Sequence, residues 1–581
     1  TLVSGRELPM HLGLPTRSVH GLPIIEHAEF GRNVPDEAMP DEDKMNLGKI
    51  YHMGKEESAN LILNRQAMAS HTFITGSTGT GKSNAVYHLL DEITKNGQTT
   101  FLVVEPAKGE YKNVFGNCTD VQVFGTNPRE TPLLRMNPFA FPENIHILEH
   151  IDRLVEIFNA CWPMYAAMPA VLKDAIERSY QKVGWDLRNS ESEKGIFPTF
   201  FDLLDILPGV IEESHYSKDT QSDYVGALCT RVKSLTNGIY GSVLCAEDAL
   251  SDAEMFDQNV IVDLSRVGSM ETKSLLMGIL VMKLQEYRMC SSGMNSRLRH
   301  VTVLEEAHNL LRKTSAEQSQ EGANLQGKSV EMLANAIAEM RTYGEGFIIA
   351  DQAPGLLDMS VIRNTNTKII LRLPDEEDRK LVGKSAALKE AQIDELSKLP
   401  LGVAAVYQNE WPEAVLCKIE AYPMPENAVY HKPSKMPHEI NAEFVFGQLA
   451  VGKELEPLSI SEMEQLKLWL KRHETVLKPE DDRYLERVFA GGELDVAKTR
   501  KAVFDFFGGI GTVVDYCAAA KKSLTPRKEF LEQLQGQYGL KAAAADWVLN
   551  SVISMGMSLN PDAKAVDNLR TNFEQQGGRV L

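Results

Sequence analysis

The feature that most constrains the fold of this chain is a glycine-rich loop, GSTGTGKS, at residues 76–83. It matches the pattern G-x-x-x-x-G-K-[ST] in full, and the runs beside it predict a strand over 71–75 and a helix over 84–96. A loop between a strand and a helix N-terminus directs backbone N–H groups and the helix dipole at a phosphate group. The pattern therefore predicts a phosphate site in an α/β fold. The alternative is a glycine-rich turn without a ligand.

Two side chains of this loop have separate expected tasks. Lys82 is expected to reach the β- and γ-phosphates of ATP, and the Ser83 hydroxyl is expected to bind Mg²⁺. The predicted nucleotide-binding residues are Gly79, Thr80, Gly81, Lys82, Ser83 and Asn84.

Nucleotide hydrolysis also requires carboxylates at the end of a neighbouring strand. The run 300–305 predicts a buried strand that ends at Glu305, and Glu306 follows it directly. Glu305 is expected to help hold Mg²⁺, and Glu306 to polarise the attacking water as the general base. The alternative is an ordinary strand end capped by acids. His308 is expected to pack against the site or support it rather than to act as a catalyst.

Three further residues are predicted to belong to the γ-phosphate environment. Glu105 ends a predicted strand, where a carboxylate helps to place water, although a solvated loop acid is an equal alternative. Gln352 follows a strand predicted over 346–350, and its amide is suited to report loss of the γ-phosphate. Arg341 precedes that strand and is the predicted arginine finger, acting on the nucleotide of a neighbouring subunit; its alternative is an intramolecular salt bridge.

Composition indicates a globular protein of roughly two to four domains. The chain has 581 residues, 43% hydrophobic and 24% charged, with a net charge of −19. Its longest uncharged apolar run, 275–282, is far shorter than the roughly 20 residues of a membrane span, so no membrane association is expected. Seven scattered cysteines without a Cys-x-x-Cys pair indicate reduced thiols, no zinc site and a cytoplasmic location. The first residue is not Met, so the chain is expected to be trimmed at its front.

The order of predicted elements divides the chain into five parts. Short β-rich runs alternate with helical patterns from residue 46 onward, as in a parallel sheet. A mobile loop is expected over 314–328, and a proline-rich linker after Tyr422. The predicted parts are an N-terminal arm or β-barrel remnant (1–45), the first part of the core (46–144), a helical insertion (145–256), the second part of the core (257–425), and a linker with a C-terminal helical region (426–581).

Taken together, these motifs resemble one known family. The segments TGSTGTGKSN (75–84), LEEAH (304–308) and RTYGEG (341–346) are similar to the HerA family of motor ATPases. The segments IADQAP (349–354) and NTNTKIILRL (364–373) resemble its bacterial branch in particular. The resemblance covers roughly residues 15–425, and its blocks occur in the family's order.

The resemblance implies a RecA-like core with a parallel-rich central sheet, assembled as a homo-hexameric ring. Such a ring hydrolyses ATP between subunits and moves duplex DNA through its central channel. Archaeal relatives work with the nuclease NurA in DNA end processing. Bacterial relatives often serve antiphage defence with a separate effector, such as a nuclease or a sirtuin-type NAD hydrolase. The residues carried over by position are Lys82, Ser83, Glu105, Glu306, Arg341 and Gln352.

Two departures from the family pattern limit what is carried over. Archaeal relatives place an arginine just before the first core strand, where this chain has Ser70 and His71 and its nearest arginine is Arg65. The N-terminal barrel of the family is expected to be absent or incomplete in this chain, so the identity of the partner is not carried over.

The leading hypothesis is a Mg-ATP-dependent DNA translocase that serves a nuclease or defence effector. The first alternative is an ATP-regulated ring scaffold that assembles and activates an effector. The second is a conjugation or secretion motor, which shares the core but is commonly docked at a membrane.

The excess of acidic over basic residues argues against DNA binding by the whole surface. It is compatible with a few basic residues that line the channel of a ring. The candidate DNA contacts are Lys108, Lys112, Arg129, Arg135 and the 314–328 loop. Solvated surface charge is an equally good explanation for each of them.

Overall fold

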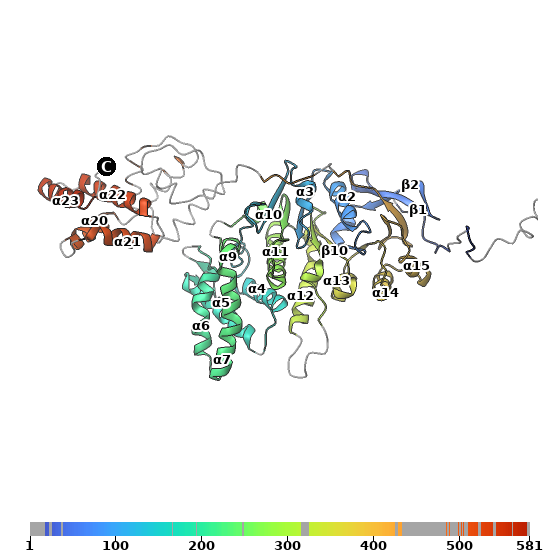
Figure 1. Ribbon diagram of the computed structural model, residues 1–581, viewed down its shortest axis with the longest axis horizontal. Helices are drawn as coiled ribbons and strands as arrows, with labels where there is room; N and C mark the ends of the chain where they lie inside the picture. Colours follow the sequence, from blue (N-terminus) through green and yellow to red (C-terminus); the bar gives the residue numbers. More distant parts are fainter. Residues whose placement is uncertain are drawn as a thin grey trace, which may run out of the picture. The chain divides into compact units, whose positions relative to one another are not determined.

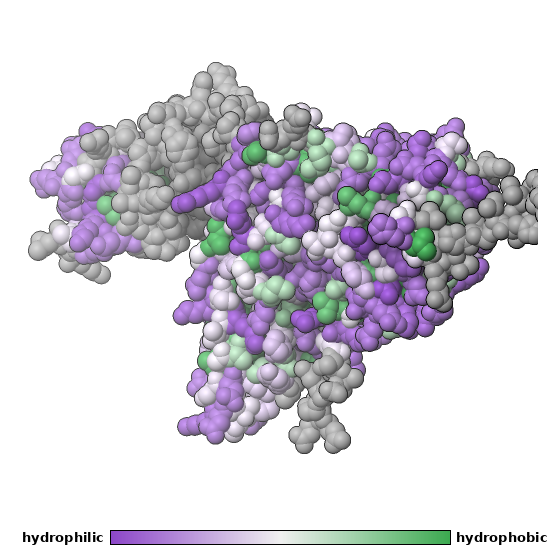
Figure 2. All heavy atoms as spheres, turned by 45° about the vertical axis from the view of Figure 1, so that its right-hand side comes forward, coloured by the Kyte–Doolittle hydropathy of each residue, from purple (hydrophilic) through white to green (hydrophobic). Residues whose placement is uncertain are grey.

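The computed structural model describes residues 18–21, 26–35, 39–165, 167–192, 195–246, 249–314, 325–424, 428–432, 509–520, 525–538, 542–559 and 562–577, with isolated positions between 484 and 504. The chain divides into two compact units, the first formed by parts of 1–123, 156–164 and 256–430, and the second by parts of 124–155, 165–255 and 431–581. No helix among the described residues is both long and apolar enough to cross a membrane. On the face drawn in Figure 2, hydrophobic side chains form scattered small patches among hydrophilic ones.

An eleven-stranded sheet runs through the first unit (Figure 1). Its strands, in spatial order, are β2 (Lys55–Asn64), β1 (Lys44–His52), β13 (Val415–Ile419), β12 (Val403–Gln408), β11 (Thr367–Ile370), β3 (Thr72–Thr75), β10 (Glu345–Asp351), β9 (His300–Glu305), β4 (Thr100–Glu105), β8 (Asn259–Asp263) and β5 (Val121–Gly125). Pairing is parallel from β11 through β8 and antiparallel from β2 through β11. This is the predicted RecA-like α/β core with a parallel-rich sheet.

The central strands are buried on both faces, which explains their continuous apolar runs. Val301 and Val303 of β9 belong to the main core cluster, and the alternate residues Thr302 and Leu304 are buried as well. A strand in the middle of a parallel sheet is covered by helices on each side, so it lacks the alternation of a half-exposed strand.

The sequence predicts β runs over 71–75, 100–105, 121–124, 259–264, 300–305, 346–350, 367–373, 402–407 and 414–419, which correspond to every strand of this sheet except β1 and β2. These two form an antiparallel hairpin that pairs with β13, joined by a turn in which Met53 and Gly54 both have positive φ. The available sequence signal for β1 was its alternation, in which the polar, partly buried Asn46 lies between the buried residues Met45 and Leu47.

Helix α2 (Lys82–Thr94) begins directly after the glycine-rich loop. Its buried residues Ala85, Val86, Leu89, Leu90 and Ile93 form one apolar face, and all five belong to the main core cluster with the strands. This face anchors the helix, so that its N-terminus stays at the carboxyl end of β3. The other helices of the first unit are α3 (Tyr111–Phe115), α11 (Met270–Ser291), α12 (Leu325–Glu339), α13 (Met359–Arg363), α14 (Glu376–Ser385) and α15 (Glu390–Glu395).

One predicted loop is shorter than the sequence indicates. Helix α12 begins at Leu325, inside the mobile loop expected over 314–328, because its apolar face of Val330, Leu333 and Ile337 supports another turn upstream. Residues 315–324 of that prediction lie outside the described residues.

The described residues of the predicted helical insertion, 145–256, are mostly helical, and 156–164 among them belong to the first unit. Its helices α5 (Met168–Lys182) and α6 (Phe200–Glu213) pack against each other, and α6 begins with a capping box of Thr199 and Asp202 (Figure 1). The remaining helices are α4 (Ile147–Cys161), which continues into the first unit, α7 (Lys218–Tyr224), α8 (Thr230–Thr236), α9 (Gly238–Leu244) and α10 (Asp252–Phe256).

The described C-terminal residues are helical. They form α20 (Gly509–Ala520), α21 (Pro526–Tyr538), α22 (Ala542–Leu559) and α23 (Ala563–Gln575), and the buried Tyr516 ring contacts both Phe530 and Phe573. The sequence predicts the helices over 527–538 and 540–555. Its predicted helix over 461–472 lies outside the described residues, and only isolated positions of 496–507 are described.

Candidate active site

The three predicted site segments meet at one edge of the sheet. Thr75 of β3 pairs with Asp351 of β10, and Ala350 of β10 pairs with Glu305 of β9. Because these strands are parallel, the glycine-rich loop, Glu306 and Gln352 all emerge from the same edge. Ligands bind in open α/β sheets at the carboxyl ends of the strands.

Backbone contacts hold the glycine-rich loop against its neighbours. The Ser77 N–H donates to the Arg372 carbonyl at 3.0 Å, and the Gly402 N–H donates to the Thr80 carbonyl at 3.0 Å. A Cβ at position 76 would lie 2.7 Å from the Leu371 Cβ, and Gly81 has a φ of 104°. Close approach and backbone conformation therefore require glycine at these two positions.

Lys82 joins the loop to the carboxylate pair. Its Nζ lies 3.0 Å from Glu305 Oε2 and 3.1 Å from Glu306 Oε1, and all three side chains are largely buried. Burial alone would lower the pKa of Lys82, but the two carboxylates outweigh it and raise the pKa above its usual value. The side chain predicted to bind phosphate thus has carboxylate partners in this state.

Glu305 is held from its other side by a residue that no motif identifies. The Tyr111 hydroxyl donates to Glu305 Oε1 at 2.6 Å, and the Tyr111 side chain is buried. Glu105 in turn accepts hydrogen bonds from the backbone N–H groups of Glu110 at 2.8 Å and Tyr111 at 3.1 Å. Glu105 therefore anchors the start of α3, and α3 carries the tyrosine that orients Glu305.

Glu105 is buried and is not the solvated loop acid that was one of its two predicted alternatives. Burial raises its pKa to about 7, although the two backbone N–H groups oppose the rise. Its carboxylate lines one cavity with Lys82, Ser83, Glu305 and Glu306, so it remains next to the predicted γ-phosphate environment.

Gln352 links the loop to the predicted general base. Its Nε2 donates to Glu306 Oε1 at 2.5 Å, and its Oε1 accepts from the Thr78 hydroxyl at 2.7 Å. Glu306 itself has a φ of 45° and a ψ of 52°, a left-handed conformation that is rare outside glycine and concentrated at functional sites. The contacts of Gln352 suit the role predicted for it, because they connect the loop directly to Glu306.

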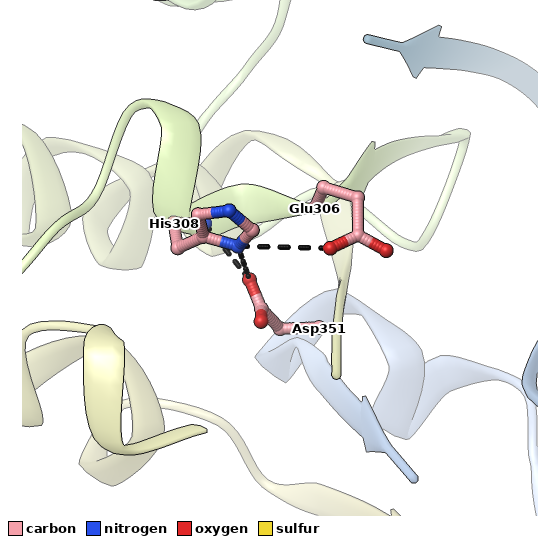
Figure 3. A group of neighbouring side chains, drawn as sticks. All are labelled: Glu306, His308 and Asp351. Atoms are coloured by element: carbon pink, nitrogen blue, oxygen red, sulfur yellow. Dashed lines mark hydrogen bonds and ion pairs between the residues drawn. The ribbon is translucent and has the colours of Figure 1, made fainter. Parts of the chain in front are cut away.

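His308 and Asp351 form a second group around Glu306 (Figure 3). His308 Nδ1 lies 2.9 Å from Asp351 Oδ2 and 3.6 Å from Glu306 Oε2. Within the described part of the chain, these three side chains are the group whose potential ligand atoms lie close enough to hold a cation. The Asp351 carboxylate also accepts the N–H groups of His308 and Ala353, so its oxygens are already committed to the protein.

The predicted magnesium ligands fit a hard cation. Ser83 and Glu305 line the same cavity, and hydroxyl and carboxylate oxygens are the donors that Mg²⁺ prefers. Ser83 stands in the first turn of α2, next to the lysine that would meet the phosphates.

The side chain of Asn84, a predicted nucleotide-binding residue, is directed at another segment. Its Nδ2 donates to the Glu420 carbonyl at 3.0 Å, and its Oδ1 accepts from the Tyr422 N–H at 2.9 Å. The Thr80 hydroxyl stays within the loop, where it donates to the Ser77 carbonyl at 2.7 Å. In this conformation, Asn84 would therefore contact a nucleotide through its backbone atoms.

A larger cavity of about 510 Å³ adjoins the start of α2 on the side of Asn84. Gly81 and Asn84 form part of its wall, and Asn60, Gly402 and Lys418 form other parts. Glu305 and Glu306 are not among its lining residues.

Arg341 does not join the other predicted site residues. It lies exposed in the short turn before β10, whereas Gln352 follows that strand. The seven residues of β10 span roughly 20 Å, which places Arg341 beyond reach of the glycine-rich loop of the same chain. Its guanidinium forms no ion pair with a described residue, so the predicted salt-bridge alternative finds no partner in that part of the chain.

One candidate DNA contact is buried. Lys112 Nζ lies 2.6 Å from Asp263 Oδ2, and both side chains are largely inaccessible. Lys108 is exposed and faces Glu110 at 3.5 Å. Lys112 therefore belongs to a buried ion pair with Asp263 in this conformation.

Sequence reasoning missed Tyr111 and Asp351, and it gave His308 only a general supporting role. Asp351 had a usable signal, because it ends a buried strand directly before Gln352. Tyr111 had none, because its contact with Glu305 joins residues 194 positions apart.

Comparison with known proteins gives similarities over most of the core. The family profile described as "Helicase HerA, central domain" matches residues 45–284. A probable helicase of Methanocaldococcus jannaschii is 23% identical over 436 residues, covering 68% of this chain and 76% of that protein. The DNA double-strand break repair helicase HerA of Sulfolobus acidocaldarius is 26% identical over 391 residues, covering 65% of this chain and 69% of that protein.

Among solved structures, VirB4 of Thermoanaerobacter pseudethanolicus aligns with a TM-score of 0.50 at 18% identity. The alignment covers 66% of this chain and 98% of VirB4. At this level of identity the likeness concerns the fold alone.

Proposed function

Because the chain belongs to the HerA family, we propose that it is an ATP-hydrolysing motor that translocates duplex DNA as a homo-hexameric ring. The single observation that carries the ATPase proposal is the meeting of Lys82 with Glu305 and Glu306 at the glycine-rich loop. A phosphate-binding lysine, an acid for the metal and an acid for water are the groups that phosphoryl transfer to water requires.

The residues present suggest how ATP is held. The N–H groups of the loop and Lys82 bind the phosphates, and Ser83 and Glu305 hold Mg²⁺, which neutralises charge on the phosphates when bound. The cavity beside Gly81 and Asn84 offers space for the nucleoside on the side away from the carboxylates. Lys82 must exchange its carboxylate partners for phosphate oxygens as ATP enters.

Hydrolysis is proposed to use Glu306 as the general base. Its Oε1 loses the contact with Lys82 when Lys82 moves to the phosphates, and it then accepts a proton from the attacking water. Gln352, hydrogen-bonded to both Thr78 and Glu306, is placed to couple the state of the phosphates to the base. Glu105 supports this arrangement through α3 and Tyr111.

Arg341 is proposed to complete the site of a neighbouring subunit, because it lies exposed at the opposite end of β10. An arginine supplied in trans stabilises the charge that develops on the phosphates. The ring is proposed to work in the cytoplasm with a separate effector, a nuclease or a sirtuin-type NAD hydrolase, in antiphage defence or DNA end processing.

The test is steady-state ATPase activity of the purified chain, with and without linear duplex DNA at low salt. We expect DNA to stimulate the rate, and Lys82→Ala and Glu306→Gln to abolish it. Lys380→Ala is the matched control, because Lys380 is exposed and its ion pair within the described residues is with Glu376, one helical turn away. A rate that ignores DNA would contradict translocation and favour the ring scaffold, in which ATP serves assembly of an effector complex.

A further inference from the structure

His308 is held in one orientation by its neighbours. It belongs to the short turn Ala307–Asn309 that follows Glu306, and both its backbone N–H and its Nδ1 meet Asp351 Oδ2, at 2.8 and 2.9 Å. Asp351 is completely buried, and its other oxygen accepts the Ala353 N–H at 2.9 Å. Asp351 therefore fixes the orientation of the imidazole ring.

The fixed imidazole faces the predicted general base (Figure 3). His308 Nδ1 lies 3.6 Å from Glu306 Oε2, whereas the contacts of Lys82 and Gln352 are both with Oε1. The two oxygens of Glu306 thus have different partners. Oε1 faces the phosphate loop and Oε2 faces His308.

The charges around the ring favour its protonated form. Asp351 and Glu306 are the acids beside it, and Arg312 is the cation that opposes them. The hydrogen bond with Asp351 raises the pKa of His308, and burial only partly counters this rise. A protonated imidazole is a hydrogen-bond donor and a positive charge next to Glu306.

Nucleotide binding changes the partners of Glu306. When Lys82 moves to the phosphates, Glu306 loses its contact with that ammonium. Gln352 also contacts Thr78 of the loop, so its position depends on the loop as well. His308 is the neighbour of Glu306 that depends on neither, because it is anchored to β10 through Asp351.

We propose that His308, backed by Asp351, is a positioning residue that holds Glu306 Oε2 once ATP has withdrawn Lys82, so that Oε1 is presented to the attacking water. The inference rests on the proposed ATPase function. Neither His308 nor Asp351 is proposed to contact the nucleotide.

The test compares His308→Ala, His308→Gln and Asp351→Asn with wild type. In His308→Ala we expect kcat to fall about 10²-fold, as for a displaced catalytic group, while the KM for ATP and the affinity for Mg-ADP change less than about twofold. His308→Gln, which keeps a donor, is expected to recover part of kcat. His215→Ala is the matched control, because His215 is an exposed histidine in the other unit.

A second readout separates positioning from a role in folding. Added imidazole should restore kcat of His308→Ala in a saturable manner and should not restore Glu306→Gln, which lacks the base itself. A wild-type kcat in His308→Ala, or a loss of kcat matched by an equal loss of Mg-ADP affinity in both His308 variants, would overturn the inference while leaving the ATPase intact. An ATP turnover indifferent to Lys82→Ala would overturn the proposed function together with it.

Discussion

Lys82 Nζ lies 3.1 Å from Glu306 Oε1, so the side chain expected to bind phosphate is paired with the one expected to activate water. Each residue neutralises the other's buried charge while the phosphates are absent. In the proposed mechanism, ATP displaces this pair before either residue acts. Nucleotide affinity and catalytic rate are therefore coupled through one contact, and a substitution at Glu306 should move them in opposite directions.

Glu306→Gln is expected to bind ATP several-fold more tightly and to hydrolyse it at least about 10²-fold more slowly. Removing one carboxylate weakens the competition for Lys82, and it also removes the base. Isothermal titration with Mg-ATP and single-turnover hydrolysis measure the two effects. Glu376→Gln, at an exposed carboxylate on α14, is the control. Weaker ATP binding in Glu306→Gln would contradict the exchange of partners.

Tyr111→Phe tests the support of Glu305 from α3. The substitution removes the hydroxyl that donates to Glu305 Oε1 and leaves a buried acceptor without that partner. We expect the free energy of unfolding to fall by about 1–3 kcal/mol, and the Mg²⁺ concentration for half-maximal ATPase activity to rise. Denaturant unfolding and a Mg²⁺ titration measure these.

The control for this prediction is Tyr51→Phe, since the Tyr51 hydroxyl has no hydrogen bond with a described residue. If Tyr111→Phe lowered stability without changing the Mg²⁺ requirement, the tyrosine would serve packing alone.

Glu345→Gln tests a buried ion network at the amino end of β10. Glu345 accepts from Arg288 Nε at 2.9 Å and from the Thr302 hydroxyl at 2.8 Å, and its Oε1 lies 2.8 Å from His300 Nδ1. Among the described residues, the variant leaves the fully buried Arg288 with Asp257 as its one carboxylate partner. We expect the free energy of unfolding to fall by roughly 3–5 kcal/mol near pH 7.

The same variant has a predictable dependence on pH. Burial alone would raise the pKa of Glu345, but His300 and Arg288 outweigh it and lower the pKa to about 2. A carboxyl group whose pKa is lower in the folded chain stabilises the fold above its unfolded value of about 4.3, and this stabilisation is lost as the pH falls toward 2. The stability difference between wild type and Glu345→Gln should therefore stay constant from pH 7 to about pH 5 and shrink below it. A constant difference down to pH 3 would show that the charge of Glu345 does not matter.

The geometry of the candidate nucleotide site was predictable from sequence where a local pattern encodes it. The loop at 76–83 predicts its own flanking strand and helix, and Glu305 and Glu306 follow an apolar run that is recognisable as a buried strand. Gln352 was placed by the same logic, and its contact with Glu306 follows from the parallel pairing of β9 and β10.

The remaining parts depend on pairings distant in sequence. Tyr111 reaches Glu305 because β4 and β9 are neighbours, and Asn84 turns away from the loop because residues 420–422 pass beside α2. The β1–β2 hairpin was missed because its alternation is broken by two register shifts. A single sequence contains no signal for which strand ends adjoin, so such contacts appear only in the folded chain.

Arg341→Ala tests whether sites are shared between subunits. Arg341 is exposed and lies at the end of β10 opposite to Gln352, so its removal cannot disturb its own subunit's phosphate contacts directly. We expect native mass to report the same assembly as wild type, while DNA-stimulated ATP turnover falls about 10³-fold, as for a trans-acting arginine. Arg363→Ala, at another exposed arginine of the first unit, should leave turnover unchanged.

Mixing Arg341→Ala with Lys82→Ala chains provides the stronger test, because each inactive chain supplies what the other lacks. Partial recovery of turnover in the mixture requires one active site built from two subunits, and an additive, inactive mixture would contradict it.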